Sequence, residues 1–307
     1  MRPGAPSATA LLVASSVVRA GAAHGLPSAA IRIAEHAVGA ARGSWLALAR
    51  YRPGRWLMAA AERVVLPGLA AHHCARKAWL WRRLQRPSVI DGAVAWAGVG
   101  FDGLGRALLE QAPHATIVET DHPDTLRLRR MWLGEAGVRM QALALPADID
   151  ALAALCAARP ATVVCEGVLM YLPPRDVVRM LRRLVAQARP PRLVFSILDT
   201  ADGHGVGFPR LPALARHWLD CHGEPFRWRA SPEQVRRCLA RAGYVVTAHW
   251  NGRALGEYMV EAEWVRVECS AAQRSCGSKR AAVVVFSSTH RESRAIKSPA
   301  GRGGRRG

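Results

Sequence analysis

Residues 93–103 read AVAWAGVGFDG, a short apolar run followed by closely spaced glycines. The apolar run predicts a buried strand, and the glycines predict a tight turn that opens a helix. Gly98 and Gly100 let the backbone approach a ligand without an intervening side chain. In an open parallel sheet, nucleotides bind at such turns, at the carboxyl ends of the strands. The stretch therefore predicts an α/β fold, although the spacing Gly98-x-Gly100-x-x-Gly103 alone fits a dinucleotide site equally well.

The same alternation of short apolar runs and amphipathic segments continues to residue 249. The apolar runs are residues 93–97, 115–118, 139–143, 161–165, 193–198 and 244–249. Predicted helices lie between most of them, for instance over residues 174–188 and 232–242, the second with Ser231 as its N-cap. This order predicts a mostly parallel sheet with helices on both faces.

Composition divides the chain into three predicted parts. Residues 1–90 are rich in alanine, with apolar residues at helical spacing and breaks at residues 27, 53–54 and 67–68, which predicts an N-terminal helical cap. Residues 91–269 form the predicted sheet domain, with an insertion near 203–228 that carries a short helix at 213–221. Residues 270–307 hold nine basic residues and one acidic residue, and we expect a disordered basic tail.

Charge and cysteine usage exclude several classes of protein. The chain carries 43 basic and 23 acidic residues, a net charge of +20, yet no basic cluster before the tail is interleaved with aromatic residues as in single-strand binders. We therefore expect no specific nucleic-acid partner. The seven cysteines and eleven histidines show no metal-binding spacing, which predicts no metal site and a reduced, cytoplasmic location. No run of eighteen apolar residues occurs, so we expect no membrane span.

Four motifs occur in a fixed order along the chain. They are PGLAAHHCARK at residues 67–77, the glycine turn at 98–103, ETDHP at 119–123, and ATVVCEGVLMYLPP at 161–174. Together they resemble the leucine carboxyl methyltransferase-like family of class I methyltransferases, over roughly residues 60–250. The resemblance implies a Rossmann-like fold, S-adenosylmethionine as cofactor and, as in bacterial members assigned to polyketide and other small-molecule O-methylation, a small-molecule acceptor.

The resemblance also implies contacts for the methionyl part of the cofactor. Arg76 corresponds to the arginine that pairs with the methionyl carboxylate, a role that suits a bidentate guanidinium. Gly98 matches the glycine that packs under the methionyl group. Glu166 matches the acidic residue near the methionyl ammonium.

For the nucleoside part, Asp121 matches the ligand of the ribose hydroxyls, helped by Glu119. Glu119 could equally be an exposed strand end. Asp148 and Ile149 stand where the family places an acidic and an aliphatic residue beside the adenine, although Asp148 is also a plausible helix N-cap.

The sequence departs from the family pattern in two places. After Asp102 the family commonly continues with threonine and arginine, whereas this chain has Gly103 and Leu104. After ETDHP, the usual threonine and glutamine and a nearby lysine become residues 124–126 (DTL) and 129–130 (RR), which we expect to alter the helix surface without touching the ribose site. Class I sheets usually end with an antiparallel strand, and we favour residues 258–267 over 281–286 for it.

The predicted activity is S-adenosylmethionine-dependent O-methylation of a carboxylate or a hydroxyl on a small molecule. Two alternatives stay open, an NAD(P)-dependent oxidoreductase and a noncatalytic basic protein that binds nucleic acid. A hydroxyl acceptor would require a base, and Tyr171, His204 and His222 are candidates that no spacing distinguishes. The catalytic residue, the acceptor and the oligomeric state do not follow from the sequence.

Overall fold

The computed structural model describes residues 6–41, 44–135, 137–157, 160–200, 212–252 and 255–265. All of them belong to one compact unit, Met1–Arg266. The predicted tail and the alternative strand at 281–286 lie outside the described residues.

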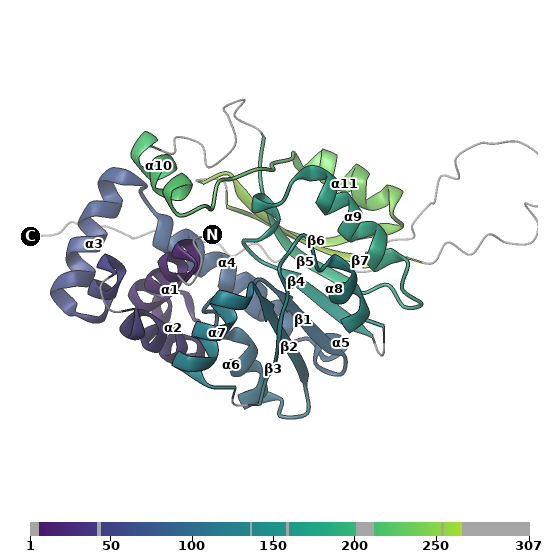
Figure 1. Cartoon of the computed structure of the whole chain (residues 1–307), viewed down its shortest axis with the longest axis horizontal. Helices are drawn as coiled ribbons and strands as arrows, with labels where there is room; N and C mark the ends of the chain where they lie inside the picture. The colour runs from purple at the N-terminus through teal and green to yellow at the C-terminus, as the bar shows by residue number, and fades with distance from the viewer. Residues whose placement is uncertain are drawn as a thin grey trace, which may run out of the picture. The chain divides into compact units, whose positions relative to one another are not determined.

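A seven-stranded sheet forms the centre of this unit (Figure 1). Its strands are β1 (Ala93–Ala97), β2 (Thr116–Asp121), β3 (Arg139–Ala142), β4 (Ala161–Cys165), β5 (Arg192–Leu198), β6 (Tyr244–Gly252) and β7 (Glu257–Trp264). The spatial order is β3-β2-β1-β4-β5-β7-β6, with β1 to β5 parallel and β7 antiparallel to both of its neighbours. The predicted mostly parallel sheet is confirmed, as is the choice of the segment after residue 257 for the antiparallel strand.

Helices cover both faces of the sheet. They are α1 (Ala8–Ala20), α2 (Ser28–Ala40), α3 (Arg52–Val65), α4 (Leu69–Leu84), α5 (Pro87–Ile90), α6 (Leu104–Gln111), α7 (Pro123–Leu133), α8 (Ile149–Leu155), α9 (Pro174–Val185), α10 (Ala213–Cys221) and α11 (Pro232–Arg241), with 3₁₀ helices η1 (Ala22–His24), η2 (Trp45–Arg50) and η3 (Leu169–Tyr171). Alternation along β1 divides the core: Ala95 packs in a cluster with α8, α9 and α11, whereas Trp96 packs in a cluster with α4 and α6.

The N-terminal helices have their own apolar core and close over the carboxyl ends of the strands. Leu11, Val38 and Met58 meet Cys74 and Phe101 in one buried cluster. The expected breaks at residues 27 and 67–68 are confirmed, but the expected break at 53–54 is wrong. Residues 53–54 lie in the first turn of α3, where a proline is tolerated because its missing N–H would have had no helical partner.

Close backbone packing joins these helices to the glycine turn. A Cβ atom on Gly103 would lie 2.6 Å from the Cα atom of Ala30 in α2. The absence of a side chain at Gly103, the third glycine of the motif, therefore allows α2 to pack directly against the turn. Within the described residues, no helix is long and apolar enough to cross a membrane.

Candidate cofactor and acceptor site

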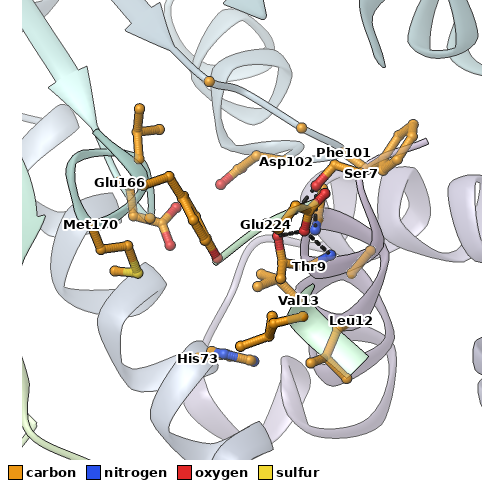
Figure 2. A pocket seen from close by; sticks show the side chains of 18 of the residues that line it. Ser7, Thr9, Leu12, Val13, His73, Phe101, Asp102, Glu166, Met170 and Glu224 are labelled. Carbon is orange, nitrogen blue, oxygen red and sulfur yellow. Dashed lines mark hydrogen bonds between the residues drawn. The ribbon is translucent and has the colours of Figure 1, made fainter. Parts of the chain in front are cut away.

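A cavity of about 820 Å³ lies where the carboxyl ends of β1, β2 and β4 face the N-terminal helices. This volume falls in the range of sites that enclose small molecules. One end is lined by the glycine turn, Asp121 and residues 166–173; the other is lined by α1, α3, α4 and the segment around α10. Figure 2 shows the two ends, with Glu166 and Asp102 on one side and His73, Leu12 and Val13 on the other.

The turn after β1 is shaped so that only glycine fits at Gly98. This residue has a φ of +71°, and a Cβ atom on it would lie 2.3 Å from Cγ2 of Val168. Its N–H donates to the carbonyl of Thr120 at 2.9 Å, which ties the turn to β2. The backbone at the carboxyl end of β1 is thus held open to the cavity, as the sequence predicts.

Asp121 ends β2 with its carboxylate fixed at the cavity. Oδ2 accepts the N–H of Gly100 at 2.6 Å, and Oδ1 accepts the N–H of His122 at 2.7 Å. Burial disfavours the charged form and raises the pKa of Asp121, and the hydrogen bonds from the N–H groups of Gly100 and His122 oppose that rise. The carboxylate is oriented by backbone groups and keeps lone pairs for a ligand.

A network of buried charges lines the same end of the cavity. Arg76 Nη2 lies 2.5 Å from Glu166 Oε1, and Lys77 Nζ donates to Glu166 Oε2 at 2.8 Å and to Asp102. Burial alone would raise the pKa of Glu166, but Arg76 and Lys77 outweigh it and lower the pKa to about 2. Glu166 is therefore ionised at neutral pH.

Arg76 is shared between two carboxylates. Its Nη1 donates to both oxygens of Glu257 at 2.6 Å, and Glu257 also bonds His72 Nε2 at 2.8 Å. Burial would raise the pKa of Glu257, but Arg76 and His72 lower it to about 2. The structure thus places Arg76 at the cavity as expected, with its terminal nitrogens already engaged by protein carboxylates.

Glu119 is not brought to the cavity with Asp121. Its carboxylate has no exposed surface and pairs with Arg129, which is equally buried. The expectation that Arg129 belongs to the helix surface is wrong, because its side chain is fully buried and its guanidinium also donates to the carbonyls of Gly100 and Asp102 at 3.2 and 2.7 Å. Arg129 thus holds the glycine turn through hydrogen bonds to its backbone.

Asp148 and Ile149 lie next to the cavity and do not line it. Asp148 occupies the N-cap position of α8, and its Oδ2 accepts the N–H of Ala144 at 2.7 Å. Ile149 is buried in the core. At this edge of the sheet, the residues that line the cavity are Leu143, Leu145 and Pro146.

The helical end of the cavity is mainly apolar and contains one buried imidazole, His73. Ser16 Oγ donates to the carbonyl of Leu12 at 3.1 Å and lies 3.0 Å from Nδ1 of His73. Because the hydroxyl has one hydrogen, both contacts are hydrogen bonds only in the tautomer that carries the ring proton on Nδ1. Nε2 of the neutral ring is therefore an acceptor.

The electrostatic surroundings keep His73 neutral. Burial lowers its pKa well below the ordinary value, and the neighbouring charge of Arg76 lowers it further. The sequence analysis missed this residue, although the positions of His73, Arg76 and Lys77, three and four residues apart on α4, place them on one helix face.

The earlier candidates for a base fare differently. Tyr171 lines the cavity, where its ring stacks on Phe226 with centroids 5.4 Å apart, and burial raises its pKa. His222 is not among the lining residues and bonds the carbonyl of Trp218 through Nδ1 at 2.7 Å. His204 lies outside the described residues.

The predicted helix at 213–221 is confirmed as α10, and the segment after it closes one side of the cavity. Glu224 accepts the backbone N–H groups of Ala8 and Thr9 at 3.1 and 3.0 Å and the hydroxyl of Thr9 at 2.6 Å. Figure 2 shows Glu224 beside Thr9, with dashed lines between them. This carboxylate caps the positive end of α1. In the part of the chain that the structure describes, no cluster of side chains has the composition of a metal site.

Solved structures of methyltransferases are similar to this chain at low sequence identity. A solved structure of a candidate methyltransferase from Thermobifida fusca YX is 18% identical, covering 75% of this chain and 94% of that one, with a TM-score of 0.48. The magnesium protoporphyrin IX methyltransferase of Synechocystis PCC 6803 is 18% identical over 66% of this chain and 87% of its own, with a TM-score of 0.44. No curated protein matches the chain. The family model for leucine carboxyl methyltransferase matches residues 31–185, just over half of the chain. The chain therefore belongs to the leucine carboxyl methyltransferase family and is an S-adenosylmethionine-dependent methyltransferase.

Proposed function

We propose that this enzyme methylates a hydroxyl oxygen on a small, largely apolar molecule. The observation that carries the proposal is His73, a buried imidazole that lines the apolar end of the cavity and whose Nδ1 lies 3.0 Å from Ser16 Oγ, which leaves Nε2 for an acceptor. A hydroxyl is a poor nucleophile until a base takes its proton, whereas a carboxylate needs no base at neutral pH. A neutral imidazole in an apolar chamber suits the first kind of acceptor.

The other end of the cavity fits the cofactor by shape and by charge. Gly98 lines the cavity with backbone alone, and the buried network holds three carboxylates, of Glu166, Glu257 and Asp102, against the cations of Arg76 and Lys77. S-adenosylmethionine carries two positive groups and one negative group, so the excess carboxylate complements it. When bound, it supplies a methyl group activated by a sulfonium.

Within this fit, each residue has a proposed role. Glu166 would hold the methionyl ammonium, Gly98 would let the methionyl group approach the backbone, and Asp121 would accept from the ribose hydroxyls. Arg76 holds Glu166 in place and stays available to the methionyl carboxylate only in competition with Glu166 and Glu257.

The residues that line the cavity lead us to revise the contacts of the adenine and of the ribose. We propose Leu143, Leu145 and Pro146 beside the adenine in place of Asp148 and Ile149. Glu119 has no proposed contact with the ribose, because Arg129 occupies its carboxylate.

Charge in the acceptor end favours a neutral acceptor group. Arg19 lines this end but is paired with Glu62 at 2.5 Å, and Arg227 is exposed at the rim. Among the described lining residues of this end, Arg227 has no ion pair but is exposed, so a carboxylate acceptor buried in the chamber would meet no buried cation that lacks an ion pair. A hydroxyl can donate to His73 Nε2 and lose its proton there, while the chamber excludes water.

The test is methyl transfer from tritiated S-adenosylmethionine to paired acceptors, 1-naphthol against 1-naphthoic acid and 1-decanol against decanoic acid. We expect transfer to the hydroxyl members. His73→Asn keeps an N–H for Ser16 but has no atom at the place of Nε2, so kcat should fall roughly 10²- to 10⁴-fold. The KM for the cofactor should stay unchanged.

His222→Asn is the matched control, because it removes an imidazole that does not line the cavity, and it should keep wild-type kcat. If wild type and His73→Asn both methylated the acids, the result would contradict the proposal and show that the acceptor group is a carboxylate. Calorimetric titration with S-adenosylhomocysteine shows separately whether an inactive variant still binds the product of the cofactor.

A further inference from the structure

Helix α3 turns its apolar face outward. Among the described residues, eleven large hydrophobic side chains are exposed, and seven of these lie within residues 45–65, on η2 and α3. Val64 and Trp56 are 84% and 72% exposed. An apolar patch of this kind on a folded protein marks an interaction surface, whereas scattered exposed residues need no explanation.

The exposed apolar residues of α3 form one continuous stripe. At 3.6 residues per turn, the exposed residues Pro53, Trp56, Leu57 and Val64 and the half-buried Ala60 lie within an arc of roughly 100°, and the exposed Ala61 and Val65 lie next to this arc on the side of the cavity. We call the five residues within the arc the outward face of α3. Met58 and Gly54, on the opposite side of the helix, are buried against the rest of the protein. The helix is therefore amphipathic, with its larger apolar side facing away from the core.

Positive charge borders this face. Arg52 and Arg63 are exposed and lie next to Trp56 around the helix, and Arg50 is exposed beside Tyr51, with its guanidinium 5.6 Å from the ring. Between residues 44 and 65 the acidic residue is Glu62, which is paired with Arg19. The surface thus joins aromatic and aliphatic side chains to unneutralised arginines.

The same surface continues into the cavity. Trp45 and Val65 are exposed and also line the acceptor end, together with Met58, Ala61 and Leu66. An apolar molecule could pass between the outer surface and the chamber without crossing a polar barrier at this place. Figure 1 shows α3 at the periphery of the helical region, away from the sheet.

We propose that the outward face of α3, with Arg50, Arg52 and Arg63, binds the surface of a membrane that contains anionic lipids. Amphipathic helices that lie in a membrane interface combine tryptophan and aliphatic side chains with arginines in this way. A second copy of the chain is a poorer occupant, because a self-complementary contact would bring like-charged arginines together. The basic segment 270–307 is disfavoured for the same reason. The proposal does not depend on the identity of the methyl acceptor.

The experiment is co-sedimentation of the full chain with vesicles of phosphatidylcholine alone or mixed with phosphatidylglycerol. We expect binding to the mixed vesicles that weakens as salt is added. The double variant Trp56→Ser with Val64→Ser should lose at least about tenfold in affinity, because apolar surface no longer enters the interface. Arg52→Gln with Arg63→Gln should lose about 20- to 30-fold, at about fivefold for each arginine near an anionic surface.

Two control variants make the same kinds of substitution outside η2 and α3. Met131→Ser removes an exposed apolar side chain, and Arg175→Gln removes an exposed arginine, so both should bind like wild type. All variants keep residues 270–307, so a loss on mutation of α3 cannot come from that segment. Affinity for S-adenosylhomocysteine, measured by calorimetry, should stay constant and report an intact fold.

Three results would overturn the proposal. The first is no binding of wild type to either vesicle. The second is binding by the α3 variants that equals wild type, which would assign the interaction to another basic segment. The third is a dimer, seen by light scattering, that dissociates in Trp56→Ser with Val64→Ser and does not bind vesicles.

Discussion

Arg129 and Glu119 form a fully buried ion pair beneath the glycine turn, with Nε to Oε2 at 2.8 Å and Nη2 to Oε1 at 2.6 Å. The same guanidinium donates to the carbonyls of Gly100 and Asp102. One side chain from α7 thus fixes the end of β2 and the turn after β1 together. The chain lacks the arginine that the family usually carries at the position of Leu104, and Arg129 reaches this turn from another helix.

Removing one partner of this pair should be severely destabilising. Arg129→Met leaves Glu119 as an uncompensated buried charge, which costs about 3–5 kcal/mol of the free energy of unfolding. Adding Glu119→Gln should recover part of the loss, since the second buried charge is then gone. Urea unfolding measures both values. Arg130→Gln, which breaks the exposed pair with Glu135, should cost less than about 1 kcal/mol; an equal loss in both variants would mean that burial of the pair is irrelevant.

Asp121→Asn should weaken binding of S-adenosylhomocysteine by about tenfold or more. The substitution keeps one acceptor oxygen but removes the charge that strengthens hydrogen bonds to ribose hydroxyls. Calorimetric titration measures the affinity, and the ligand-induced rise in Tm should shrink with it. Asp150→Asn, an exposed carboxylate on α8, is the control and should bind normally. Wild-type affinity in Asp121→Asn would remove this residue from the proposed site.

His73 predicts a pH dependence of stability near neutrality. Its pKa in the folded protein lies well below the value of about 6.5 in the unfolded chain, so the unfolded chain binds the extra proton first as pH falls. The free energy of unfolding should therefore decrease below about pH 6.5, with a slope of up to about 1.4 kcal/mol per pH unit from this group. Glu166 and Glu257 add their own loss only below about pH 4.5, because their pKa values of about 2 are lowered.

Urea unfolding between about pH 5 and pH 8 tests this dependence. His73→Asn should flatten the slope, because the group that takes up the proton on unfolding is absent. His36→Asn removes an exposed imidazole and should keep the wild-type slope. A slope that is unchanged in His73→Asn would show that His73 is not held neutral in the folded protein.

Local sequence signals predict most of the sheet and part of the site. The strands at 93–97 and 161–165 and the glycine turn follow from short apolar runs and from glycines, which act over a few residues. Asp121 and Glu166 are implied by the family resemblance, and they line one cavity because parallel strands bring their carboxyl ends to one edge. Local patterns suffice wherever the strand end itself forms the site.

Partners that come from distant segments could not be predicted in this way. Glu119 is two residues before Asp121 and also carries a carboxylate. It pairs with Arg129 in the core and does not line the cavity. Glu257 meets Arg76 across 181 positions of sequence, and no spacing rule relates them. His73 acquires its chemistry from Ser16 on another helix, so its role depends on tertiary packing that the sequence pattern does not contain.

Glu224 predicts that closure of the acceptor end depends on the N-terminus of α1. The carboxylate accepts two backbone N–H groups and one hydroxyl there, and Ser7 Oγ accepts a third N–H, from Ala10. Glu224→Ala should lower the free energy of unfolding by about 1–2 kcal/mol, through loss of a charged cap. It should also free the segment that follows α10 from α1, because these hydrogen bonds join the two.

Hydrogen exchange followed by mass spectrometry distinguishes this local release from general weakening. In Glu224→Ala, exchange should accelerate in peptides that cover residues 8–10 and 218–226, while the strands β1 and β4 keep their protection. Affinity for S-adenosylhomocysteine should stay unchanged, since the hydrogen bonds of Glu224 go to α1 and not to Asp121 or Glu166, whereas the KM for a methylated acceptor should rise. Glu35→Ala removes an exposed carboxylate paired with Arg55 and should leave exchange at α1 as in wild type. Uniform acceleration across the sheet in Glu224→Ala would instead make Glu224 a support of the whole fold, because a local contact cannot change exchange in strands that it does not touch.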